Sequence, residues 1–77
     1  MKTAYRHIWF EEIEPKPKTK QFMIRSNAGE GDSFLGYIKW YGPWRRYCLF
    51  TLPDIVFDAE CLEDIQDFLK NLMLERK

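Results

Sequence analysis

The chain has 77 residues, twelve basic and twelve acidic side chains, and an aromatic content of 17%. This length predicts a single domain, residues 1–77, whose small core depends on the large area that aromatic side chains bury. The balanced charge excludes the overall positive excess of a typical duplex-binding protein and the negative excess of a nucleic-acid mimic.

The first predicted element is a strand over residues 5–14. Apolar and polar residues alternate through this segment, with Ile8 and Phe10 on one face. Pro15 and Pro17 end the strand, because proline has no N–H to donate to a neighbouring strand. A solvated turn follows.

A second strand is predicted over residues 20–26, with Phe22 and Ile24 on its apolar face. It pairs with the first strand as a hairpin. The segment 27–33 is rich in Gly, Asp and Asn, which favour turns, so we interpret it as a loop. A loop that cradles an anion is the alternative, but the segment lacks the Lys-Ser/Thr ending of a phosphate loop.

The segment 34–52 predicts two more strands, 34–41 and 44–52, joined by a reversal at Gly42-Pro43. Gly36 in mid-strand indicates a bulge or room for a large neighbouring ring. One face of the third strand carries Phe34, Gly36, Ile38 and Trp40, and the other carries Leu35, Tyr37, Lys39 and Tyr41. The apolar side of the fourth strand carries Trp44, Cys48, Phe50 and Leu52, opposite Arg45, Tyr47 and Leu49. Arg46 falls on the apolar side of this alternation, which indicates a bulge or a register that ends near the reversal.

The last predicted element is a helix with Asp58 as its N-cap, since this carboxylate can accept hydrogen bonds from amides of the first turn. The short apolar run 55–57 before it is expected to add a brief edge pairing. Apolar residues recur in the helix at helical spacing: Cys61, Leu62, Ile65, Phe68, Leu69, Leu72 and Met73.

These elements predict an α+β fold. A four-stranded antiparallel sheet carries one C-terminal helix on one face, because one apolar helix face requires one apolar sheet face. Sequential strands tend to pair, so a meander in the order 1-2-3-4 is the expected topology.

Aromatic and basic residues crowd around Gly42-Pro43. The cluster contains Lys39, Trp40, Tyr41, Trp44, Arg45, Arg46 and Tyr47. One interpretation places Trp40 and Trp44 in the core, with the cations as solubilising charges. A second is a protein interface, in which Trp, Tyr and Arg are common hot spots. A third is a site for single-stranded nucleic acid or a nucleotide, where rings stack on bases and cations neutralise phosphates. The predicted binding residues are Lys39, Tyr41, Trp44, Arg45, Arg46 and Tyr47.

No catalytic constellation is recognisable, so we expect a protein that is not an enzyme and uses no cofactor. One histidine and two cysteines cannot complete a four-ligand zinc site without carboxylates or a second chain. Cys48 and Cys61 are expected to be buried thiols rather than a disulfide. His7 is expected to be structural. The acids of the helix predict a normal solvent face, with an acidic ridge for a basic partner as the alternative.

The segment 35–72 combines several short patterns: Leu35-Gly36-x-Ile38-Lys39-Trp40, Trp44-Arg45-x-Tyr47, Phe50, Phe57 and Cys61-Leu62-x-x-Ile65-x-x-Phe68. This combination resembles a family of small uncharacterised proteins of bacteriophages and prophages; the first 34 residues do not contribute to the resemblance. The resemblance implies a viral accessory protein that acts inside a bacterial cell, often by binding and inhibiting a host or defence component. It carries over no catalytic or binding residue.

The leading hypothesis is therefore a phage-type accessory protein that binds a host or phage protein through the hairpin. A module for single-stranded nucleic acid or a nucleotide is one alternative, and a structural homo-oligomer is another. No apolar run approaches the ~20 residues of a membrane span and no signal segment is recognisable, so we expect a cytoplasmic protein without a membrane partner.

Overall fold

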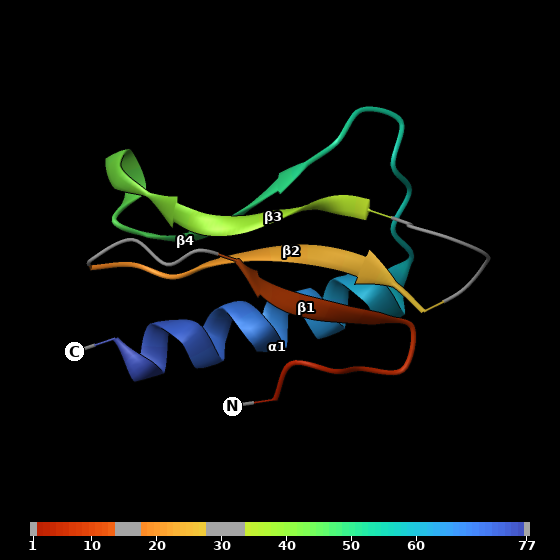
Figure 1. Ribbon diagram of the computed structural model, residues 1–77, viewed down its shortest axis with the longest axis horizontal. Helices are drawn as coiled ribbons and strands as arrows, with labels where there is room; N and C mark the ends of the chain where they lie inside the picture. The colour runs from red at the N-terminus through yellow and green to blue at the C-terminus, as the bar shows by residue number, and fades with distance from the viewer. Residues whose placement is uncertain (1, 14–17, 28–33, 77) are drawn as a thin grey trace.

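The computed structural model describes residues 2–13, 18–27 and 34–76. Its elements are β1 (Ile8–Ile13), β2 (Gln21–Ser26), β3 (Phe34–Tyr41), the 3-10 turn η1 (Gly42–Trp44), β4 (Arg46–Thr51) and α1 (Ala59–Glu75). The four strands form one antiparallel sheet in the order β1-β2-β3-β4, and α1 lies along one side of it (Figure 1). The α+β meander is thereby confirmed. Pro15, Pro17 and most of the predicted loop 27–33 lie outside the described residues.

β1 begins three residues later than the sequence predicts. The chain reverses just before Ile8, so that Ala4 bridges to Trp9 and the Phe10 N–H donates to the Thr3 carbonyl at 2.8 Å. Tyr5 therefore precedes the strand instead of opening it. The chain before the reversal runs antiparallel to β1 and covers part of that edge.

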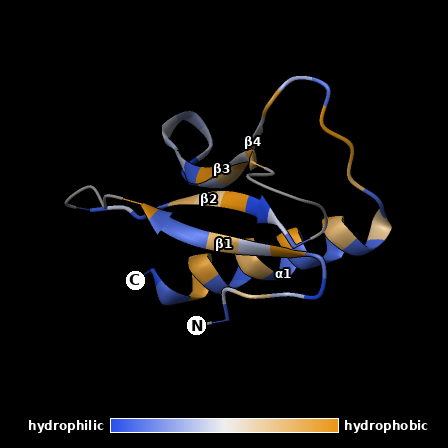
Figure 2. Cartoon of the chain, turned by 45° about the vertical axis from the view of Figure 1, so that its right-hand side comes forward, coloured by the Kyte–Doolittle hydropathy of each residue, from blue (hydrophilic) through white to orange (hydrophobic). Residues whose placement is uncertain are grey.

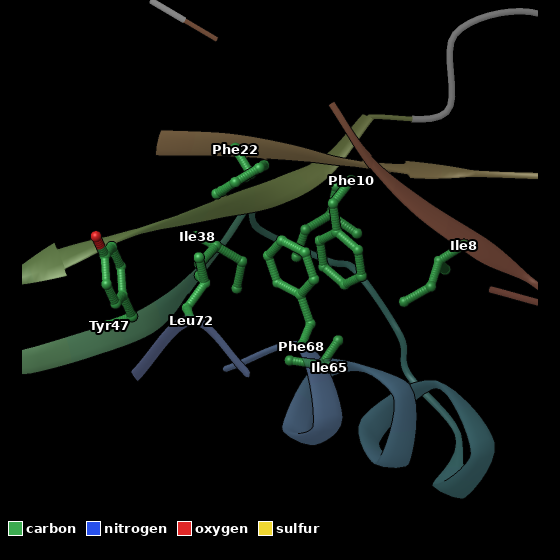
Figure 3. Packing of buried hydrophobic residues seen from close by; sticks show 9 residues of the cluster. Ile8, Phe10, Phe22, Ile38, Tyr47, Ile65, Phe68 and Leu72 are labelled. Carbon is green, nitrogen blue, oxygen red and sulfur yellow. The ribbon is translucent and has the colours of Figure 1, made fainter. Parts of the chain in front are cut away.

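The hydrophobic core lies between α1 and the sheet (Figure 3). Phe68, which is fully buried, stacks on Phe10 with ring centroids 3.8 Å apart and meets the edge of Phe22 at 4.8 Å. The buried residues are Ile8, Phe10, Phe22, Ile24, Ile38, Tyr47, Ile65, Phe68 and Leu72. Every strand and the helix thus contribute to one core.

The pairing of β2 with β3 contains an irregularity beside Gly36. Ile24 pairs with Gly36, but Arg25 pairs with Phe34, so Leu35 is an extra residue on β3. Leu35 packs against the core, whereas Phe34 pairs with an outward residue. The predicted faces of Phe34 and Leu35 were therefore wrong, because the bulge reverses the alternation at this point.

Gly36 itself is required by the close approach of β4. A Cβ atom at this position would lie 2.5 Å from the backbone oxygen of Phe50. The bulge predicted from Gly36 is present, at the neighbouring Leu35. The space beside Gly36 is filled by the β4 backbone and not by a neighbouring ring.

The side of β4 that meets the core is opposite to the predicted one. Trp40 pairs with Tyr47 and Ile38 with Leu49, so Tyr47 and Leu49 face the helix while Phe50 faces away from it. β3 and β4 pair without a break, so no bulge occurs at Arg46. Arg46 lies on the same side of β4 as Phe50, and this side faces away from the core. Its position therefore fits a regular alternation.

The helix begins as predicted. The Asp58 carboxylate accepts a hydrogen bond from the Cys61 N–H at 2.9 Å, which confirms the N-cap. Segment 55–57 forms no strand: Val56 is 89% exposed, and Phe57 packs against the core instead. This segment is part of the arch that leads from β4 to α1, where Figure 2 shows an apolar stretch. Among the described residues, no helix has the length and apolar composition to cross a membrane.

Candidate binding face

The β3–β4 reversal is a tight turn that presents three large side chains to solvent. Pro43 suits the start of η1, since its fixed φ fits the first turn of a helix and its missing N–H is not needed there. Arg45 then adopts a left-handed conformation, φ 53°, and its N–H donates to the Gly42 carbonyl at 3.1 Å. Trp44 is 65% exposed, and Arg45 and Arg46 are exposed. The turn therefore holds an indole and two guanidinium groups at one end of the sheet.

The structure groups five of the six predicted binding residues and separates Tyr47 from them. Tyr41 and Trp44 meet edge to face at 5.1 Å. Tyr47 is only 6% exposed, and its hydroxyl accepts a hydrogen bond from the Lys20 N–H at 3.1 Å. Tyr47 therefore packs in the core and lies apart from the other five predicted binding residues. Trp40 is also on the helix side, edge-on to Tyr47 at 5.4 Å.

Lys39, Tyr41 and Arg46 belong to a larger surface, the sheet face opposite α1, which we call the outer face. Trp44 adjoins it through its contact with Tyr41, and Arg45 lies at the turn. No helix or strand of the described chain packs against the outer face (Figure 1). The strand pairing places Trp9 beside Arg25, Tyr37 beside Phe50, and Tyr41 beside Arg46. Six aromatic side chains belong to the outer face: Trp9, Phe34, Tyr37, Tyr41, Trp44 and Phe50.

Five of these rings form a connected series across β3 and β4. Phe34 meets Tyr37 at 4.9 Å, and Tyr37 pairs with Phe50 across the strands. Phe50 meets Tyr41 at 5.9 Å, and Tyr41 meets Trp44. Apart from Trp44, these rings are half-buried, so each keeps part of its surface accessible to solvent. The series runs from the bulge in β3 to the turn.

The cations of the outer face lie among these rings. The Lys39 ammonium is 4.6 Å from the centre of the Phe50 ring and 5.8 Å from that of Tyr37, both within cation–π distance. At the β1 end, Arg25 Nε lies 2.7 Å from the Glu11 carboxylate. Lys39, Arg45 and Arg46 have no acidic partner within salt-bridge distance among the described residues. Among the described residues, the outer face and the turn together carry four cations, Lys39, Arg25, Arg45 and Arg46, against one acid, Glu11.

Negative charge collects on the opposite side of the molecule. The helix α1 together with its N-cap and C-cap carries six acids against two bases, Lys70 and the C-cap Arg76. The acids are Asp58, Glu60, Glu63, Asp64, Asp67 and Glu75. A chain with no net charge is thus polarised, with a basic outer face and an acidic helix.

The titratable groups with shifted pKa values lie on the helix side. Burial raises the pKa of the Tyr5 hydroxyl, and its 2.7 Å hydrogen bond to Asp67 adds to the rise. Burial also raises the pKa of the Cys61 thiol, whereas hydrogen bonding to Cys61 lowers the pKa of Asp58. His7 lies 2.9 Å from Glu60, an ion pair when the imidazole is protonated. The contacts of Tyr5 and His7 tie the N-terminal segment to the middle and the first turn of α1, which is a structural role.

The described residues contain no group of three or more His, Cys, Asp or Glu side chains that could hold a metal ion. Cys48 lies on the outer face and Cys61 packs against the core from α1, and both are free thiols. The rings and cations of the outer face can stack on flat groups and pair with anions.

Sequence reasoning missed Trp9, Phe34, Tyr37 and Phe50 as members of this surface. Tyr37 and Trp9 were recognisable, since each alternates with residues of the core face. Phe34 was hidden by the bulge. Phe50 was assigned to the apolar side of β4 because the alternation does not show which of two aromatic sides meets the helix.

One comparison places the chain among known proteins. It is 43% identical over 61 residues to "Uncharacterized 9.3 kDa protein" of Acholeplasma phage L2, which covers 79% of this chain and 78% of that protein. The chain belongs to this phage protein family. The match spans more residues than the whole chain after residue 34, so it must include part of the first 34 residues. The resemblance therefore extends beyond the segment 35–72 on which the sequence analysis based it. No family model matches the chain, and no solved structure matches it significantly.

Proposed function

We propose that this phage-family protein acts by binding and not by catalysis, and that the outer face together with the β3–β4 turn is its contact surface. The observation that carries the proposal is the division of the aromatic residues. One group builds the core with α1, whereas six rings lie on the sheet face that no helix covers.

Fold stability alone does not account for this arrangement. Polar and β-branched side chains are sufficient on the solvent face of an antiparallel sheet, where alternation of apolar and polar residues is the rule. Trp, Tyr and Arg combine a large contact area with hydrogen-bonding or charged groups, and they dominate the energetics of binding surfaces. Their concentration on one face supports a role in contacting a macromolecule of the infected cell, either a host component or another phage product.

Capture from infected-cell lysate tests the proposal. The immobilised wild-type chain is compared with Trp44→Ala, which removes the most exposed ring of the surface, and with Leu74→Ala, which removes an exposed apolar side chain from α1. Bound protein and bound nucleic acid are quantified separately. We expect the wild type and Leu74→Ala to retain the same partner and Trp44→Ala to lose most of it.

A partner that binds all three forms equally would show that the contact lies elsewhere on the molecule. Retention of no partner by the wild type would contradict a binding role. Circular dichroism of each variant shows whether a lost partner reflects the surface or the fold.

A further inference from the structure

We infer that the outer face binds single-stranded nucleic acid, with the rings stacking on bases and the cations contacting phosphates. This inference rests on the proposed function and names the class of partner. Base stacking on aromatic side chains tolerates sequence, because every base has a flat π-face, and it is usually combined with a basic surface that follows the backbone. The outer face has both features.

The positions of rings and cations fit this class of ligand. Tyr37, Phe50 and Tyr41 are adjacent and half-buried, so the sheet holds them in place while part of each ring stays accessible. The Lys39 ammonium lies over the Phe50 ring, 4.6 Å from its centre, so a base stacks on Phe50 only when Lys39 moves aside, and the displaced ammonium is then next to the phosphates that flank this base. Arg46 lies opposite Tyr41 at the turn. Each cation is thus next to a ring, as bases and phosphates are next to one another along a strand.

Charge distinguishes this ligand from a second copy of the chain. A two-fold dimer formed through the outer faces would bring two basic surfaces together, and like charges that meet destabilise an interface. The acidic helix directs an anionic strand away from α1 and toward the outer face and the turn, whose described residues include four cations against Glu11.

Fluorescence anisotropy of labelled oligonucleotides tests the inference with the full chain. The probes are a single-stranded thymidylate and a single-stranded uridylate of about 12 nucleotides, within the roughly 4–16 nucleotides that small binding modules cover, and a duplex of equal length. We expect at least one single strand to bind more tightly than the duplex. The comparison of the two single strands shows whether DNA or RNA is preferred.

Salt dependence gives a quantitative check. Three cations, Lys39, Arg45 and Arg46, have no acidic partner within salt-bridge distance in the described chain. Three phosphate contacts predict a slope of about −2 for the logarithm of affinity against the logarithm of salt concentration. Affinity should then fall about 20-fold between roughly 50 and 200 mM salt. Lys39→Gln should make the slope shallower by about 0.7.

Ring and control variants complete the design. Trp44→Ala should weaken single-strand binding roughly 5- to 150-fold, the usual effect of removing one stacking ring. Lys70→Gln and Leu74→Ala change exposed side chains of α1 and should bind like the wild type.

Three results would overturn the inference: equal affinity for duplex and single strand, unchanged affinity of both Trp44→Ala and Lys39→Gln, or no binding of either single strand. If neither single strand binds but lysate capture yields a protein that depends on Trp44, the proposed function stands and the nucleic-acid assignment falls. If both experiments give nothing, both proposals fall. A dimer in light scattering that disappears in Trp44→Ala would assign the face to a second copy of the chain.

Discussion

Phe68 is the side chain on which we expect the fold to depend most. Its ring is fully buried, stacked on Phe10 at 3.8 Å and edge-on to Phe22 at 4.8 Å. Phe68→Ala should cost about 3–5 kcal/mol through lost burial and the cavity that remains. A chain of this length has roughly 4–12 kcal/mol of total stability, so the loss is a large share of it and unfolds the variant when the wild type lies at the low end of that range. Phe68→Leu keeps most of the volume and loses two ring contacts, which predicts a cost of about 1–3 kcal/mol.

Urea unfolding followed by circular dichroism measures both changes. With a slope near 1 kcal/mol per molar urea, Phe68→Leu should lower the midpoint by about 1–3 M. Leu74→Ala is the matched control, since Leu74 is 73% exposed and a surface change of this kind stays within about 0.5 kcal/mol. A midpoint for Phe68→Leu equal to that of Leu74→Ala would refute the described packing of α1 on the sheet.

Three further variants test other parts of the structure. Gly36→Ala should lower the melting temperature strongly, because the new Cβ would lie 2.5 Å from the Phe50 backbone oxygen. A melting temperature equal to that of the wild type would show that β3 and β4 are farther apart at this position than the structure describes. Asp58→Ala should destabilise the protein most at neutral pH, because hydrogen bonding to Cys61 lowers the folded-state pKa of the carboxyl below 3.8. The stabilisation by this carboxylate is present above pH 3.8 and is lost as the pH falls through the folded-state pKa. A difference in melting temperature between variant and wild type that stays constant down to about pH 2 would exclude the cap. Tyr47→Phe should cost about 0.5–1.5 kcal/mol in urea unfolding while leaving partner capture unchanged, and reduced capture by a folded variant would return Tyr47 to the binding surface.

The fold was predictable because burial leaves a periodic signal. The helical recurrence of Ile65, Phe68 and Leu72 and the alternation around Phe22 and Ile24 both correspond to the observed core. The N-cap at Asp58 was equally clear, since a carboxylate before an apolar helical pattern is a local feature. Local and periodic features do not depend on where distant parts of the chain lie.

The candidate site was predictable only in part, because its extent depends on register. The turn residues Trp44 and Arg46 were recognisable from composition near Gly42-Pro43. The outward position of Phe50 follows from the pairing of Trp40 with Tyr47, which no count along one strand contains. Phe34 joins the outer face through the bulge opposite Arg25, and a bulge arises between two strands.

The start of β1 was missed for a similar reason. The residues before Ile8 alternate like a strand, yet the chain reverses there and Tyr5 reaches the helix, where its hydroxyl donates to Asp67. Alternation identifies residues that suit a strand, and it does not locate a reversal that distant contacts stabilise.

Amide chemical-shift mapping of the isotopically labelled protein tests the central claim most directly. On addition of the single-stranded oligonucleotide, we expect the largest shifts at the outer-face residues of β3 and β4 and at the indole N–H of Trp44, with residues 60–75 of α1 nearly unchanged. Shifts confined to α1 or to the N-terminal segment, or a spectrum without change under conditions where anisotropy reports binding, would contradict the assignment of the outer face as the contact surface.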